Sequence, residues 1–406
     1  MYYCFSQYFN SFYSNKILPL SHTKHIGEFM RKPSKTKWKP SKQWLKTYIP
    51  VFCSMAALLI FSIITICVMP AIETSVIEGS KRTYASGLPL KTVAPFVDMS
   101  SWIDPNSAYS INGVPNLGKF AEDTSVKVYN LGFINPLTNN PTNADGSINW
   151  GWGGYSSLTK NSTNSQYLGI KQSIQNLKDM GGTCIVSVGG QAGDAPWKVT
   201  QNVDSLEAMY LDIIDTYSIK RLDLDIEENN QDTDHNIANA KAIKRVQDAT
   251  NIEITLTIPI MPSGWQQKQI NIIDAYLSQG VDVTMINSMC MCYGSGVAVS
   301  EDYGDASIRA IENSIQQMKV IYSNYGQELT DVQAYQKTGC TVSIGYESYL
   351  YPTFTPSMMQ KVAAHAKKHN YGMLSFWSMG RDSTIDGNTG ISSKYAFTEI
   401  AVAYLV

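Results

Sequence analysis

Eight short apolar runs rich in Val, Ile and Thr alternate with amphipathic runs from residue 92 to the C-terminus. Apolar, β-branched runs of this length predict buried strands, and the longer runs between them predict helices. The predicted strands span residues 93–99, 126–134, 183–188, 221–227, 253–259, 281–291, 341–346 and 372–378. Repeated strand–helix alternation is typical of parallel strands, and eight of them favour a closed (β/α)8 TIM barrel over an open doubly wound α/β sheet.

The predicted helices carry their apolar residues on one stripe. In the clearest case Leu206, Met209, Ile213 and Tyr217 recur at helical spacing. The other helical patterns span residues 167–180, 236–250, 270–279, 307–325, 357–370 and 394–405. The connection between the first two strands has no good helical pattern, so we expect an irregular unit there. No Gly-rich phosphate loop opens any of these helices, which disfavours an enzyme that uses NAD or ATP, and we expect no cofactor.

A basic segment and an uncharged apolar run precede the predicted barrel. Residues 31–46 contain seven Lys or Arg and no acid, and residues 51–69 contain no charge. As a helix this run is about 28 Å long, which suffices to cross a bilayer. We therefore expect a basic cytoplasmic tail at 1–50, a single transmembrane signal anchor at 51–72 and a linker at 73–91. The positive-inside rule places the domain at 92–406 in the periplasm or outside the cell, and cleavage of the anchor would release a secreted protein. Residues 1–30 have no assignable fold, and translation could start at Met1 or Met30.

The charge and the Cys and His content disfavour several classes of function. Only 16% of the residues are charged and the net charge is -2, so nothing suggests nucleic acid as a partner. The Cys residues of the predicted barrel lack a CxxC spacing, and His365 and His369 lack the Glu of a zinc protease motif. We expect no metal site. We also expect a monomer.

Three acids alternate with Leu and Ile in the fourth predicted strand. Because a strand has a period of two, Asp223, Asp225 and Glu227 would share one face. Neighbours on that face are about 6 to 7 Å apart, and in a poorly hydrated site such carboxyls cannot all be ionised together. At least one would then hold a proton near neutral pH, as a general acid requires. The alternative is an edge strand with a solvated acidic face.

The motifs around these acids resemble one enzyme family. The stretch from Asp223 to Glu227 resembles the DxDxE end of the DxxDxDxE signature of glycoside hydrolase family 18, the chitinases and endo-β-N-acetylglucosaminidases. Residues 185–190 resemble the SxGG motif on the third strand of that family, where the glycines allow a tight strand exit. Three further stretches, 255–259, 291–294 and 376–382, resemble its bacterial and archaeal chitinase branch. The order and spacing of the motifs agree from about residue 93 to the C-terminus.

The sequence departs from the family pattern at three places. Lys220 and Arg221 replace the first Asp and the Gly of the long signature, which must change the hydrogen bonding beneath Asp223. Glu228 stands where this branch often has Gly and adds a charge beside the acid. Cys292 stands where the branch commonly has Asp, which removes a carboxylate that would help to bind the acetamido group of the substrate. These changes bear on rate and specificity rather than on the reaction class.

The resemblance implies a substrate-assisted reaction that retains the configuration of the sugar. In this family the carbonyl oxygen of the substrate's own 2-acetamido group is the nucleophile. Glu227 would be the general acid and base. Asp225 would hold the acetamido N–H and stabilise the oxazolinium cation, and Asp223 would share a proton with Asp225.

The resemblance also implies a substrate pocket at the carboxyl ends of the strands. Tyr293 would donate a hydrogen bond to the acetamido oxygen, and Trp377 would form the floor of the pocket. Met291, from the same motif as Tyr293, would contact the substrate. Trp102 and Trp152 fall near predicted strand ends and could line a groove. Without the family pattern, Trp377 in its apolar strand would be read as a core residue, and Tyr293 could be either a core or a site residue.

The leading hypothesis is a retaining glycosidase that acts on β-1,4-linked N-acetylglucosamine in chitin or chitooligosaccharides. An endo-β-N-acetylglucosaminidase acting on N-glycans is the alternative within the same class, because loops decide which sugars fit. A catalytically inactive chitin-binding lectin of the same fold is the alternative from another class. Cys292 and Lys220 favour the lectin, whereas Glu227 and Asp225 speak against it.

Overall fold

The computed structural model describes residues 87–89, 91–294, 297–298, 300–385 and 389–405. These residues belong to one compact unit, Ser80–Val406. The predicted cytoplasmic tail, the predicted transmembrane anchor and most of the predicted linker lie outside them. Within the described ranges, no helix combines the length and the apolar character that a bilayer crossing requires.

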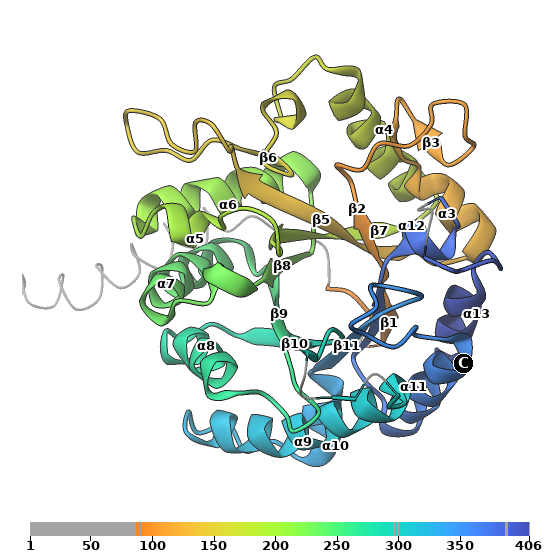
Figure 1. Cartoon of the computed structure of the whole chain (residues 1–406). Helices are drawn as coiled ribbons and strands as arrows, with labels where there is room; N and C mark the ends of the chain where they lie inside the picture. The colour runs from red at the N-terminus through yellow and green to blue at the C-terminus, as the bar shows by residue number, and fades with distance from the viewer. Residues whose placement is uncertain (1–86, 90, 295–296, 299, 386–388, 406) are drawn as a thin grey trace, which may run out of the picture. The chain divides into compact units, whose positions relative to one another are not determined.

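Parallel strands form the centre of the unit and helices surround them (Figure 1). The strands follow one another in the order β1, β12, β11, β10, β9, β8, β7, β5 and β2, and every neighbouring pair is parallel. Their bounds are β1 Thr92–Val93, β2 Phe96–Asp98, β5 Val128–Pro136, β7 Thr183–Gly189, β8 Arg221–Asp225, β9 Glu253–Pro259, β10 Val283–Cys290, β11 Thr338–Ser343 and β12 Met373–Trp377. A further strand, β6 (Trp150–Trp152), adds to β5 in the antiparallel direction.

The first barrel strand consists of two pieces, β1 and β2, separated by Ala94 and Pro95. β1 pairs with β12 and β2 pairs with β5, so the first strand contacts both neighbours and the sheet returns on itself. Pro95 has no N–H to give to a neighbouring strand. The carbonyl of Ala94 instead accepts hydrogen bonds from the side chains of Asn130 (2.8 Å) and Ser375 (2.7 Å). The parallel, barrel-like sheet confirms the predicted TIM-barrel architecture.

Seven helices fall where the apolar stripes predict them. They are α4 Ser165–Asp179, α6 Val203–Tyr217, α7 Thr233–Thr250, α8 Gln267–Ser278, α9 Tyr303–Ser323, α11 Pro356–His369 and α13 Ala396–Ala403. Each buries its stripe against the sheet or a neighbouring helix, which is the usual source of helix stability in a protein. Shorter helical segments, α5 Pro196–Val199, α10 Asp331–Gln336, α12 Met379–Asp382, η1 Ser156–Leu158 and η2 Glu228–Asn230, occupy the loops.

The connection between the first two barrel strands contains a helix, contrary to the prediction. Helix α3 (Leu117–Thr124) follows a two-stranded hairpin of β3 (Ser110–Ile111) and β4 (Val114–Pro115). The side chain of Asn116 accepts the N–H of Lys119 and caps the helix. With eight residues and a Gly in its first turn, α3 is too short to give a clear helical period, so the stripe was missed.

The parallel strands bring their carboxyl ends to the same end of the barrel. β8 ends at Asp225, two residues earlier than predicted, and Glu227 lies in the loop that follows. Trp377 ends β12, and Gly189 ends β7. Most of the residues singled out in the sequence therefore lie at this end.

Candidate active site

The structure brings Asp223, Asp225 and Glu227 together, and we call these three residues the carboxylate column. Asp223 and Asp225 are 0% and 3% exposed on β8, and Glu227 is half-buried. Their negative charges act on one another. Burial on this scale excludes the alternative of a solvated acidic edge strand.

Two hydroxyl groups from the strands on either side of β8 hold Asp223, and side chains of β10 and β11 extend this network. Ser187 on β7 donates to Oδ2 at 2.5 Å, and Thr257 on β9 donates to Oδ1 at 2.6 Å. Asn287 on β10 donates to the Thr257 hydroxyl at 3.0 Å and accepts from Thr341 on β11 at 2.8 Å. Sequence reasoning found neither Asn287 nor Thr341, although both occupy inward positions of the two-residue strand period. The resulting chain of hydrogen bonds fixes the carboxylate of Asp223 in the barrel interior.

Burial changes the acidity of the whole carboxylate column. It raises the pKa of Asp223 to about 6, although its two hydroxyl donors act in the opposite direction. Burial and the charges of Glu227 and Asp223 raise the pKa of Asp225 well above its usual range. Burial also raises the pKa of Glu227 to about 7, although the hydrogen bond from Asp225 lowers it. The column therefore carries a proton near neutral pH, and Asp225 shares it with Glu227.

One oxygen of Asp225 lacks a hydrogen-bond donor within the part of the chain that the structure describes. Oδ1 of Asp225 is buried and accepts no hydrogen bond from the described residues. A buried carboxyl oxygen without a donor is costly. An N–H group placed there would remove that cost, so Asp225 is suited to bind a ligand that carries an N–H.

Two glycines and an asparagine position the loop that carries Glu227. Gly189 and Gly190 have φ angles of 110° and 86°, a region that glycine favours. A Cβ atom on Gly189 would lie 2.3 Å from the carbonyl oxygen of Asp225, so only glycine allows β7 to approach β8 this closely. The backbone N–H of Asn230 donates to the carbonyl of Glu227 at 2.8 Å, and its side chain accepts from the N–H of Ala195 at 3.0 Å.

Three aromatic rings pack together: Trp377 at the carboxyl end of β12, Phe133 within β5 and Phe96 at the start of β2. Trp377 is half-buried and stacks on Phe133, with ring centroids 5.9 Å apart and an angle of 23° between the planes. Phe96 completes the group at 6.1 Å from Phe133 and 6.3 Å from Trp377. Sequence reasoning identified Trp377 but not the two phenylalanines that support it. An aromatic face held in this way can receive the apolar face of a sugar ring.

A polar cluster of Cys292, Ser343, Glu347 and Arg381 follows strands β10, β11 and β12, and we call it the rim cluster. Arg381 donates to Glu347 at 2.7 Å and to Ser343 at 3.2 Å, and Ser343 also donates to Glu347. Loss of solvent around its sulfur and the charge of Glu347 raise the pKa of the Cys292 thiol to about 11, with a smaller contribution from Glu227. Cys292 is therefore a neutral thiol beside the column. Glu347 lies in no motif, and no sequence signal pointed to it.

The structure does not bring Tyr293 to the carboxylate column. Tyr293 is buried, its hydroxyl lies 3.3 Å from that of Ser307 on α9, and its ring packs on Tyr303. Cys292 has a φ of 48°, and this left-handed residue interrupts the strand alternation that would have put Tyr293 on the face of Met291. Met291 itself is half-buried just after β10.

The two tryptophans predicted to line a groove differ in their surroundings. Trp102 is 68% exposed in the loop after β2 and is accessible to a ligand. Trp152 is fully buried, and its indole N–H donates to the hydroxyl of Tyr217 at 2.8 Å. The prediction that Trp152 binds substrate is therefore corrected, because β6 turns this side chain against α6 in the core.

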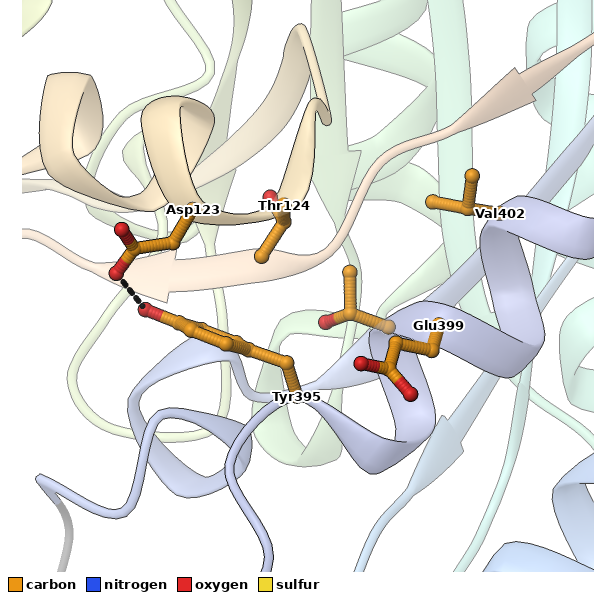
Figure 2. A pocket seen from close by; sticks show the side chains of 6 residues that line it. Asp123, Thr124, Tyr395, Glu399 and Val402 are labelled. Carbon is orange, nitrogen blue, oxygen red and sulfur yellow. Dashed lines mark hydrogen bonds between the residues drawn. The ribbon is translucent and has the colours of Figure 1, made fainter.

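A cavity of about 240 Å³ lies between α3 and α13 (Figure 2). Its lining residues are Asp123, Thr124, Tyr395, Thr398, Glu399 and Val402. Asp123 already accepts hydrogen bonds from Tyr395 at 3.1 Å, Tyr109 at 2.8 Å and Lys119 at 2.7 Å. Because Asp123 already has these three donors, we assign no ligand to this cavity. No group of three or more His, Cys, Asp or Glu side chains in the described ranges is arranged to hold a metal ion.

Comparison with known proteins identifies chitinases. No family model matches the chain. It is 28% identical over 336 residues to a probable bifunctional chitinase/lysozyme of Escherichia coli (strain K12), which covers 77% of this chain and 34% of that protein. It is 27% identical over 307 residues to endochitinase 11 of Metarhizium anisopliae, which covers 72% of this chain and 53% of that protein. The chain thus spans between about a third and about half of the length of these relatives.

Solved structures confirm the fold. The catalytic domain of a hyperthermophilic chitinase from Pyrococcus furiosus superposes with a TM-score of 0.64 at 24% identity, covering 79% of this chain and 97% of that domain. Catalytic-site mutants of active domain 2 of a thermostable chitinase from the same organism, complexed with chito-oligosaccharides, give a TM-score of 0.64 at 24% identity, with 80% and 97% covered. The resemblance to chitinases that the motifs indicated is therefore confirmed.

Proposed function

We propose that the barrel, which is similar to chitinases in sequence and in fold, is a glycoside hydrolase of family 18 that hydrolyses β-1,4 linkages between N-acetylglucosamine units of chitin or chitooligosaccharides. The observation that supports the proposal most directly is the protonated carboxylate column at the carboxyl end of β8. A binding protein has no need of a buried carboxyl pair that shares a proton, whereas a general acid requires one.

Glu227 acts as the general acid. Its pKa of about 7 keeps a large fraction of the side chain protonated near neutral pH, and its place at the end of the column gives it access to a glycosidic oxygen. After the leaving sugar departs, the same side chain as a carboxylate activates water. Each proton transfer of this kind contributes about 10²- to 10⁴-fold to the rate.

The substrate supplies the nucleophile. Its 2-acetamido carbonyl oxygen attacks the anomeric carbon, as in the substrate-assisted exceptions to the two-carboxylate scheme. Asp225 accepts the acetamido N–H on its unpartnered Oδ1 and stabilises the positive charge of the oxazolinium ion. Asp223 remains in the hydrogen-bond network of Ser187 and Thr257 and balances the charge of Asp225 from below.

The aromatic rings of Trp377, Phe133 and Phe96 form the floor for the apolar face of the sugar. The rim cluster offers a neutral thiol, a carboxylate and a guanidinium to polar groups of the substrate. We assign Tyr293 no direct contact, because its hydroxyl faces Ser307 in the core.

Hydrolysis is tested with fluorescent aryl glycosides of chitobiose and chitotriose. The Glu227→Gln variant should lose about 10³-fold or more in kcat while it keeps its affinity for chitotriose, since acid and base catalysis both require the carboxyl. Glu228→Gln is the control: Glu228 is exposed and adjacent, and because its charge acts only by raising the pKa of Glu227, this variant should shift the pH profile but keep most of its kcat. If wild type and Glu227→Gln are equally inert and both bind chitotriose, the protein is a lectin and the proposal is wrong.

We also propose that residues 51–72 anchor the protein with the barrel outside the cytoplasm. Support comes from the uncharged run and the basic segment before it. A reporter that is active only outside the cytoplasm, fused to the C-terminus, should be active. An inactive fusion that is expressed at normal level contradicts this orientation.

A further inference from the structure

A buried cation lies beneath the carboxylate column. Arg221 is the first residue of β8 and is 3% exposed. Residues 221, 223 and 225 point the same way along a strand, so its side chain enters the barrel below Asp223. Its Nε and Nη2 each lie 2.8 Å from Oε2 of Glu253 on β9. Among the buried residues of the described ranges, Arg221 is the only Lys or Arg.

Apolar groups surround this ion pair. Ile185 lies beside Arg221 on β7, and the sulfur of Met285 is 4.0 Å from Nη1. The N–H of Leu88, in the segment before β1, lies 3.4 Å from Oε2 of Glu253. Charges separated by such a dry environment act over longer distances than in water. The side chain of Glu253 is 23% exposed and that of Arg221 only 3%, so water screens the anion more than the cation.

Arg221 is the positive charge that acts on Asp223. The other groups that face Asp223 are hydroxyls, an amide and carboxyls. β7 contributes the Ser187 hydroxyl, and β9 contributes the Thr257 hydroxyl, to which Asn287 of β10 donates. On β8 itself the charged groups are Arg221 below and Asp225 above, with Glu227 beyond Asp225. These carboxyls compete for a proton, and a cation below the column favours the negative charge on the lowest one.

We propose that Arg221 is a positioning residue: its charge keeps Asp223 ionised and so keeps the shared proton on Asp225, next to Glu227. This inference deepens the proposed hydrolytic function and rests on it. Burial raises the pKa of Asp223 to about 6; the hydroxyl donors Ser187 and Thr257 oppose this, and the charge of Arg221 lowers the pKa of Asp223 further. In the family pattern this position is Gly, so the cation is a feature of this chain.

The test uses two variants that break the same ion pair but have opposite electrostatic effects. Arg221→Met removes a positive charge below Asp223 and should raise the pKa of Asp223. The acid limb of the kcat/KM profile should therefore move to higher pH, by about 0.5 to 1 pH unit. Glu253→Gln removes the negative charge that opposes Arg221. It should lower the pKa of Asp223 and move the acid limb to lower pH. Arg221→Lys keeps a charge of the same sign and should leave the limb near that of wild type. The full chain is used with chitotriose glycoside as substrate.

A second measurement does not depend on turnover. Carbon-13 NMR titration of labelled Asp carboxyls, with Asp223→Asn to identify the signal, reports the pKa of Asp223 directly. Opposite shifts in Arg221→Met and Glu253→Gln support the inference, even if the wild type proves inert and the hydrolytic function fails. Shifts in the same direction, or none, overturn it and show that the ion pair only stabilises the barrel. Should Arg221→Met fail to fold, the sign of the Glu253→Gln shift decides.

Discussion

Removal of the Ser187 hydroxyl should destabilise the barrel more at pH 8 than at pH 4. Ser187 and Asp223 are both fully buried, and the hydroxyl donates to the carboxylate at 2.5 Å. A hydrogen bond to a charged group contributes about 1.5 to 3 kcal/mol, and one to a neutral group about 1 kcal/mol. At pH 8 Asp223, whose pKa is about 6, is ionised, so Ser187→Ala loses the larger amount. At pH 4 the carboxyl is protonated and the loss is smaller.

The sign of this effect follows from linkage between protonation and folding. The pKa of Asp223 in the folded state, about 6, exceeds the value of about 3.9 for an unfolded Asp. The native state therefore binds more protons between these values, and its contribution to stability falls as the pH rises through that window. Ser187→Ala raises the folded pKa further, by about one unit for each 1.4 kcal/mol by which the loss with ionised Asp223 exceeds the loss with protonated Asp223. The variant should thus continue to lose stability above pH 6, where the wild-type contribution has levelled off.

The measurement is urea unfolding of the wild type and the variant at pH 4, 6 and 8. Ser375→Ala is the matched control, because Ser375 is equally buried and donates at 2.7 Å to the neutral carbonyl of Ala94. Its loss of stability should be the same at each pH. If Ser187→Ala also shows one loss at every pH, Asp223 does not titrate in this range and the assignment of its charge is refuted.

Three further predictions concern the sugar floor, the core and the rim cluster. Trp377→Ala should lower kcat/KM about tenfold, a loss of about 1.4 kcal/mol, because it removes the stacked face; steady-state kinetics with an unchanged value would exclude Trp377 from the substrate site. Trp152→Phe should lose about 1 to 3 kcal/mol of stability, because it leaves the buried Tyr217 hydroxyl without its donor. Its KM should not change, and a changed KM would restore Trp152 to the substrate site. Cys292→Asp adds a charge near Glu227 and should raise the pKa of Glu227 above about 7, moving the basic limb of kcat/KM upward. Cys292→Ser is its control. If the basic limb of Cys292→Asp does not move, a charge at position 292 does not act on Glu227.

The features with a strict period were predictable from the sequence. Apolar, β-branched runs that alternate with helices carrying an apolar stripe predicted the barrel, and the two-residue alternation of acids in β8 predicted the carboxylate column. The short helix α3 was missed because its eight residues span little more than two turns, which is too few for a period to stand out. The residues before Gly87, where the anchor is predicted, lie outside the described part of the chain.

The predictions that failed at the site concern residues outside regular, predicted strands and helices. Cys292 adopts a left-handed conformation, so the alternation from Met291 predicts the wrong face for Tyr293. Trp152 lies on β6, a strand that the sequence analysis did not predict and that pairs with β5 in the antiparallel direction. Glu347 lies in a loop, and a loop has no repeating sequence pattern from which its place at the site could be predicted. Contacts between loops depend on tertiary packing and leave no local signal.

The two-residue period of β8 also connects a departure from the family pattern to the chemistry. Arg221, Asp223 and Asp225 occupy successive inward positions of one strand, and Glu227 continues the same spacing into the loop. Along this column a cation, Arg221, lies at the start of β8, and the carboxyls that share a proton, Asp225 and Glu227, lie at and just after its carboxyl end. A substitution at position 221 is buried and remote from any substrate, yet it lies in the same column as the acid. Its effect should reach Glu227 through the protons of Asp223 and Asp225, which is why the pH profile tests it more directly than the rate at a single pH.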